Sequence, residues 1–134
     1  MSDVNPGAAI LIGGERASPQ ERLLDRALRA AALDLVNRLR ASGIENVLLA
    51  GPDLAWAPPD LAACVEPDDG PFHFGARLAQ VVRTHAYSPL LYFGAGSVPL
   101  LPVDTIIGAL AMLVEAERAG RRLVVTNNLH SCDW

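Results

Sequence analysis

The feature that most constrains this chain is a short apolar run near its amino terminus that ends in two adjacent glycines. Residues 8–12 are all apolar, and Gly13 and Gly14 follow directly. A continuous apolar run of this length is typical of a strand buried on both faces of a parallel sheet. Glycines at its carboxyl end let the backbone approach a ligand and allow positive φ angles. The run therefore predicts a ligand site at these glycines, with an ordinary strand-to-helix turn as the alternative.

Strand and helix signals alternate along the rest of the chain. Ser18 is a candidate N-cap, Pro19 suits the first helical position, and Glu21 completes a capping box, which predicts a helix over 19–41. Further helices are expected at about 75–85 and 103–119, and further strands at 46–50, 62–66, 89–93 and 122–126. This alternation predicts an α/β fold, a three-layer α/β/α domain with a mainly parallel, Rossmann-like sheet.

Each predicted helix carries apolar residues at helical spacing, which we expect to face the sheet. They are Leu24, Leu28, Ala31, Leu35 and Leu39 in the first helix, Leu78, Val81 and Val82 in the second, and Ile106, Ile107, Leu110, Leu113 and Val114 in the third. Gly43 and Gly120 are expected to end the first and third helices. The helices should therefore cover both faces of the sheet.

Composition argues against several functional classes. Hydrophobic residues make up 51% and charged residues 19% of the 134 residues, which is typical of a single globular domain. No apolar run approaches the roughly 20 residues of a membrane span, and no signal-peptide pattern is present, so we expect a cytoplasmic protein without membrane contact. Cys64 and Cys132 are the only cysteines, which suits a reducing compartment. The net charge of −4 argues against nucleic-acid binding.

A second glycine turn, Gly94-Ala95-Gly96-Ser97, follows the strand expected at 89–93. If this strand is the neighbour of the strand at 8–12, the two glycine turns face one crevice. Such a crevice is the topological switch point where mononucleotides bind in open α/β sheets. The dinucleotide fingerprint Gly-x-Gly-x-x-Gly is absent after the first strand. The phosphate-loop motif, which needs a lysine, is also absent because all eleven basic residues are arginine.

Three short motifs resemble those of one enzyme family. Leu11-Ile12-Gly13-Gly14 resembles the Leu-Ala-Gly-Gly opening of nucleotidyltransferases with the GT-A-type fold, the group that includes molybdenum-cofactor guanylyltransferase. Residues 42–47 are similar to the family's Gly-Ile-x-x-Val entry to its second strand, and residues 96–101 to its Gly-Asp-x-Pro-Leu-Leu turn. Residues 69–75 stand where the family has a glycine- and proline-rich segment that helps cover the nucleobase. The resemblance spans residues 8–126.

The resemblance implies a nucleoside triphosphate site and nucleotidyl transfer. A small phosphorylated acceptor would attack the α-phosphate and release pyrophosphate, with Mg²⁺ neutralising the developing charge. The residues that the resemblance places at the nucleotide are Leu11, Gly13, Gly14, Glu15, Arg16, Gly70, Gly75, Gly96 and Ser97. Backbone N–H groups of the first glycine turn would hold phosphate, and Arg16 would be the only nearby cation.

Departures from the family pattern bear on the metal and on activity. The family's metal-binding aspartate is replaced here by Ser97, whose neutral hydroxyl is a poorer Mg²⁺ ligand. In the family, the first glycine turn continues with a further glycine, an arginine and a nearby lysine, and residues 15–18 stand at these places here. Because complete members continue for several more strands, we expect residues 1–134 to be one nucleotidyltransferase-like domain that is incomplete at its carboxyl end, or a shortened relative. The alternatives are a non-catalytic nucleotide-binding or scaffolding domain and a flavodoxin-like binding domain. Homo-oligomerisation is left open.

Other polar residues are weaker candidates for ligand contact. The carboxylate pair Asp68-Asp69 is a candidate for metal binding, although turn carboxylates are usually solvated. Residues 130–133 include His, Cys and Asp without the paired spacing of a zinc site. Asn127-Asn128 follows the strand expected at 122–126 and would lie at the edge of the glycine turns. No partner is visible in the sequence for His73 or His85, and we expect surface or partly buried roles for both.

Overall fold

A computed structural model of the chain describes residues 3–14, 17–96 and 100–125. Four strands, three α-helices and one 3₁₀ helix are present in this part of the chain. In order they are β1 (Gly7–Leu11), α1 (Pro19–Ala41), β2 (Val47–Gly51), η1 (Pro59–Cys64), β3 (Val65–Pro67), α2 (Phe74–His85), β4 (Leu90–Gly94) and α3 (Val103–Arg118).

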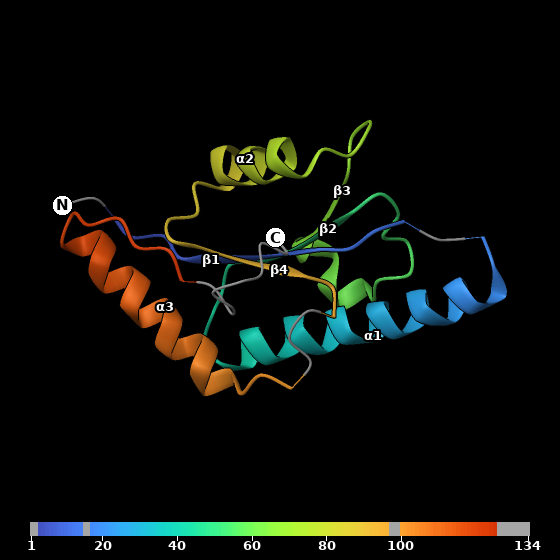
Figure 1. Cartoon of the computed structure of the whole chain (residues 1–134), viewed down its shortest axis with the longest axis horizontal. Coiled ribbons are helices and arrows are strands. Elements are labelled where there is room, and N and C mark those ends of the chain that lie inside the picture. Colours follow the sequence, from blue (N-terminus) through green and yellow to red (C-terminus); the bar gives the residue numbers. More distant parts are fainter. Residues whose placement is uncertain (1–2, 15–16, 97–99, 126–134) are drawn as a thin grey trace.

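The four strands form one parallel sheet in the order β3-β2-β1-β4 (Figure 1). β1 is an interior strand, because its last residue, Leu11, pairs with Ala50 of β2 and with Gly94 of β4. All five residues of β1 are buried, as the apolar run predicts. The prediction of an α/β fold with a parallel sheet is confirmed, and the arrangement is consistent with a Rossmann-like fold.

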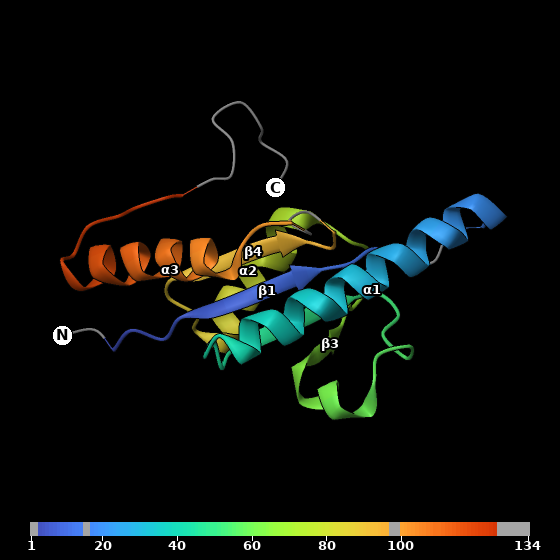
Figure 2. The ribbon, with the colours of Figure 1, turned by 90° about the horizontal axis from the view of Figure 1, so that it is seen from below.

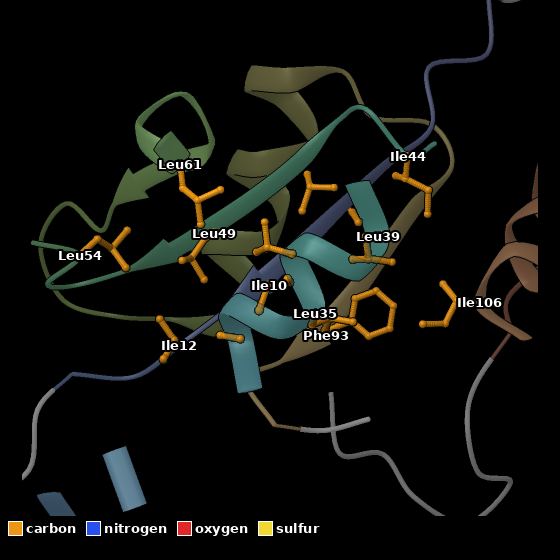
Figure 3. Close-up of a cluster of buried hydrophobic side chains, with 14 residues drawn as sticks. Ile10, Ile12, Leu35, Leu39, Ile44, Leu49, Leu54, Leu61, Phe93 and Ile106 are labelled. Atoms are coloured by element: carbon orange, nitrogen blue, oxygen red, sulfur yellow. The ribbon is translucent and has the colours of Figure 1, made fainter. Parts of the chain in front are cut away.

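Helices lie on both sides of this sheet: α1 and α3 on one side and α2 on the other (Figures 1 and 2). Successive residues of β1 point to opposite faces, so Ile10 belongs to the larger core, towards α1, and Ala9 to a smaller core with Val81 of α2. Figure 3 shows the larger core, in which Ile10, Leu39 and Leu49 are fully buried. Burying one such side chain stabilises the fold by about 1.5–3 kcal/mol. The two cores hold β1, and hence its carboxyl end, in place.

Helix α1 begins where the sequence predicts because its capping box forms. The Glu21 N–H donates to the Ser18 hydroxyl (3.2 Å), and the Ser18 N–H donates to the Glu21 carboxylate (3.1 Å). The prediction that Leu24 faces the sheet is wrong, since 47% of this residue is exposed. The amino-terminal part of α1 extends beyond the sheet, so the described strands do not cover Leu24 (Figures 1 and 2). Within the described part of the chain, no helix, α1 included, is both long and apolar enough to cross a membrane.

Three other details differ from the sequence-based expectations. Residues 122–125 form no strand and are exposed, and residue 126 lies outside the described residues. A β-branched run becomes a strand only where a neighbouring strand and a packed face take it up, and within the described residues β4 pairs only with β1. The third strand is shorter than expected because residues 59–64 form a 3₁₀ helix. Val82 of α2 and Ile107 of α3 are 39% and 38% exposed rather than buried. β4 is the last strand at this edge of the described sheet, so no further described strand lies beside it to cover them.

Candidate functional site

The carboxyl ends of β1 and β4 lie side by side, which brings the two glycine turns of the sequence together. Leu11 pairs with Gly94, and the Ala95 N–H donates to the Leu11 carbonyl at 2.9 Å. β2 and β3 lie on one side of β1, whereas β4 lies on the other, so the strand order reverses at this point. The expectation that these two strands are neighbours is confirmed. The edge of the sheet between them is a topological switch point.

The first glycine turn leaves room for a ligand. Gly13 and Gly14 are exposed, and among the described residues other than its chain neighbours no atom would lie within 4 Å of a Cβ added to Gly13. A Cβ on Gly14 would lie 3.1 Å from the Pro52 side chain. Neither glycine has a positive φ angle, although glycine could adopt one at either position. The fold itself therefore does not require glycine at position 13, where the space beside the backbone is open.

Two other glycines fix the positions of the two turns. Gly96 has a φ of +78°, which disfavours any residue with a side chain, and its Cβ would lie 2.8 Å from the Leu28 side chain of α1. Gly51 ends β2, and its Cβ would lie 2.7 Å from the backbone oxygen of Ile12. The close approach of Ile12 to Gly51 thus fixes the path of the chain as it leaves β1, immediately before Gly13. Sequence reasoning missed Gly51, although a glycine at the end of a buried neighbouring strand is a visible signal.

Of the remaining predicted site residues, the structure describes Gly70 and Gly75, which lie away from these turns. Gly70 and Gly75 belong to the connection between β3 and α2 and to the first turn of α2. They follow the carboxyl end of β3, which is separated from β1 by β2, so two strand spacings of about 5 Å each intervene. Glu15, Arg16 and Ser97 lie outside the described residues, as do Asn127-Asn128 and residues 130–133.

A buried ion-pair cluster joins β3 to α2 at the same edge of the sheet. Arg77, only 6% exposed, donates through Nε to Asp68 Oδ1 (2.8 Å) and through Nη1 to Glu66 Oε1 (2.7 Å). His85 Nε2 lies 2.6 Å from Glu66 Oε2. The expectation of a solvated Asp68 is wrong, because its side chain is 7% exposed and pairs with Arg77. His85, for which the sequence shows no partner, contacts Glu66.

Sequence reasoning missed this cluster as a unit, although its spacing was visible. Glu66 and Asp68 are two residues apart along an extended segment, which places both on one side of the chain. Arg77 and Gln80 are three residues apart on α2, so they lie on one helix face, and Arg77 Nη1 donates to Gln80 Oε1 at 3.0 Å. These spacings show which side chains share a face within each element, but the sequence does not show that the two faces meet.

The cluster alters the titration of its members. Burial alone would raise the pKa of Glu66, but hydrogen bonds from Arg77 and His85 outweigh burial and hold this pKa below its ordinary value. Burial likewise would lower the pKa of Arg77, and its bonds to Glu66 and Asp68 outweigh this effect and raise the pKa. The ion pair between Arg77 and Glu66 is therefore present at neutral pH.

We expect the fold to lose stability in acid partly through Glu66. Because the pKa of this carboxyl is lower in the folded than in the unfolded chain, its contribution is full above the unfolded value near 4.5 and is lost as pH falls through the folded pKa. Urea unfolding across this pH range measures the effect. The unfolding free energy of Glu66→Gln should depend less steeply on pH than that of the parent, whereas exposed Glu45→Gln should keep the parent's slope. Equal slopes for the parent and Glu66→Gln would contradict this assignment.

An open apolar groove of about 440 Å³ lies between α2 and the first residue of β4. It is lined by Gly75, Leu78, Ala79, Val82, Arg83 and Leu90. Apart from Gly75, none of the predicted site residues lines it, and its apolar walls do not suit a triphosphate. Gly13 and Gly14, which are exposed, do not line this groove.

Comparison of this chain with protein-family models, curated proteins and solved structures finds no match. Within residues 3–14, 17–96 and 100–125, no group of three or more His, Cys, Asp or Glu side chains is placed to hold a metal ion.

Proposed function

We propose that this chain is a nucleotidyltransferase-like domain that binds a nucleoside triphosphate where β1 and β4 end. The observation that carries this proposal is the adjacency of these two strands: Leu11 pairs with Gly94, and each strand continues into a glycine turn. Ligands of open α/β sheets bind at such a switch point. In this proposal the fold is the three-layer α/β/α GT-A type of a cytoplasmic nucleotidyltransferase.

The first glycine turn suits phosphate groups. The open space beside Gly13 lets phosphate oxygens approach the backbone N–H groups of Gly13 and Gly14, which act as donors. Helix α1 follows at Pro19, but its start is capped by Ser18 and Glu21 and extends beyond the sheet, so the proposed phosphate site depends on the turn itself (Figures 1 and 2). Arg16 supplies positive charge from the segment between the turn and this helix. Residues 69–75 cover the nucleobase.

The proposed activity of such a nucleotidyltransferase-like domain is transfer of the nucleotidyl group to a small phosphorylated acceptor. Mg²⁺ does not fit the described residues, because Asp68 is held by Arg77 and no acidic cluster is available. A hydroxyl at Ser97 is a poor substitute for a carboxylate ligand. This disagreement favours a second candidate function, a domain that binds the nucleotide without catalysing transfer.

Titration calorimetry and a pyrophosphate assay test these proposals. We expect the parent chain to bind a nucleoside triphosphate and to release little pyrophosphate with or without magnesium. Ser97→Asp should strengthen triphosphate binding in the presence of magnesium, because it adds a carboxylate oxygen beside the second turn. Absence of nucleotide binding by the parent would refute the proposed function. Rapid magnesium-dependent pyrophosphate release by the parent would refute the non-catalytic candidate.

A further inference from the structure

We infer that Arg77 is a positioning residue that holds both ends of the loop 69–73 at the carboxyl edge of the sheet. The role of this loop towards a nucleotide rests on the proposed function. The position of the loop itself does not, since it follows from contacts within the chain.

One residue anchors the loop at its start and at its end. The Arg77 side chain donates through Nε to Asp68, the residue before the loop, at 2.8 Å. The Arg77 backbone N–H donates to the carbonyl of His73, the last residue of the loop, at 2.8 Å. This is the ordinary backbone bond of the first turn of α2, so the Arg77 side chain ties the start of the loop to the helix that fixes its end. Asp68 is tied in turn to the end of β2, because its N–H donates to the Gly51 carbonyl at 2.7 Å. The loop is therefore connected through Asp68 to the strand beside β1.

The geometry of the guanidinium group explains why this residue is arginine. In addition to Asp68, it contacts Glu66 twice, through Nη1 to the carboxylate (2.7 Å) and through Nη2 to the backbone carbonyl (3.3 Å). A planar group with donors in fixed directions sets the angle between these partners, whereas a lysine ammonium does not. Arg77 and the Asp68 side chain are only 6% and 7% exposed, so water has little access to replace these bonds. Buried ion pairs of this kind specify geometry more than they add stability.

The loop between these anchors is exposed throughout. Residues 69–73 are all exposed, and 55% of Phe72 is accessible to solvent. The loop thus combines fixed ends with free side chains, and it follows a strand whose carboxyl end lies at the same edge as the glycine turns. Through Arg77, the ion-pair cluster sets how this loop is presented to a ligand at that edge.

Amide hydrogen exchange of the protein without ligand, combined with calorimetric titration of a nucleoside triphosphate, tests this inference. In Arg77→Lys the charge is kept and the fixed donor directions are lost. The Asp68 amide, whose bond to the Gly51 carbonyl anchors the start of the loop, should therefore exchange at least about tenfold faster (hereafter loop exchange), while β1 amides keep their rates. Triphosphate affinity should fall about tenfold. Asp68→Asn, which keeps the shape of Asp68, should cause a smaller change in the same direction. Exposed Arg83→Lys on the same helix should change neither quantity.

The outcomes separate the inference from the proposed function. Parent-like loop exchange in both Arg77→Lys and Asp68→Asn would overturn the positioning role. Faster loop exchange with unchanged triphosphate affinity, in a parent that binds, would overturn the role of the loop towards the nucleotide. Faster loop exchange in variants of a parent that binds no nucleotide would confirm that Arg77 positions the loop and refute only the proposed function.

Discussion

Replacement of Gly51 with valine should lower the unfolding free energy by about 3 kcal/mol, the upper end of the usual cost of overpacking a core. Gly51 is buried at the end of β2, and its Cβ would lie 2.7 Å from the Ile12 carbonyl oxygen and 2.9 Å from the Ile12 side chain. The oxygen belongs to the backbone of a residue whose N–H donates to Ala50 at 2.9 Å, so it cannot move away without loss of that bond. Urea unfolding measures the change.

Gly108→Val is the matched control for this substitution. Gly108 lies on the exposed side of α3, and its Cβ would have nothing within 4 Å, so valine there should change the unfolding free energy by no more than about 0.5 kcal/mol. If Gly51→Val is as stable as Gly108→Val, Ile12 does not lie as close to Gly51 as the structure has it. The position inferred for the first glycine turn would then be wrong as well, because Ile12 directly precedes it.

Replacement of Gly13 with valine should weaken nucleoside triphosphate binding by about 10- to 100-fold, which corresponds to about 1.4–2.7 kcal/mol. The valine side chain would fill the open space through which phosphate reaches the backbone N–H groups of the turn. The fold should tolerate it, because Gly13 is exposed and has no positive φ angle, and no described residue beyond its chain neighbours comes within 4 Å of its Cβ. Calorimetric titration gives the affinity, and thermal unfolding reports on the fold.

The control again uses Gly108→Val, which should bind the triphosphate as tightly as the parent. Both substitutions place the same side chain at an exposed glycine with free space around it, so only the location differs. If Gly13→Val binds the triphosphate as tightly as the parent, phosphate does not bind at the first glycine turn. Loss of affinity together with unfolding would instead show that the fold requires glycine at this position.

Much of the fold could be predicted because local sequence and tertiary packing agree. The apolar run at 8–12 predicts a doubly buried strand, and the strand at Gly7–Leu11 is buried along its full length. Ser18, Pro19 and Glu21 predict the start of α1, and the capping box forms there. These signals succeed because they depend on a few neighbouring residues and on burial that the whole sheet shares.

The rest depends on partners that a local pattern does not reveal. Residues 122–125 have the composition of a strand, yet they lie unpaired and exposed. Leu24 continues the apolar stripe of α1 in the amino-terminal part of the helix, which extends beyond the sheet (Figure 2). Arg77 and Asp68 are nine residues apart, and the sequence does not show that the chain between them folds back to join the two charges. Such errors concern what covers or contacts an element, rather than whether the element forms.

The central claim, that a nucleoside triphosphate binds where β1 and β4 end, is tested most directly by backbone amide chemical shifts during titration with the nucleotide. The largest shifts should belong to residues 11–14 and 94–96, because their N–H groups lie in or beside the two glycine turns. Shifts confined to the apolar groove lined by Leu78, Val82 and Leu90, or no shifts at any concentration of nucleotide, would contradict it.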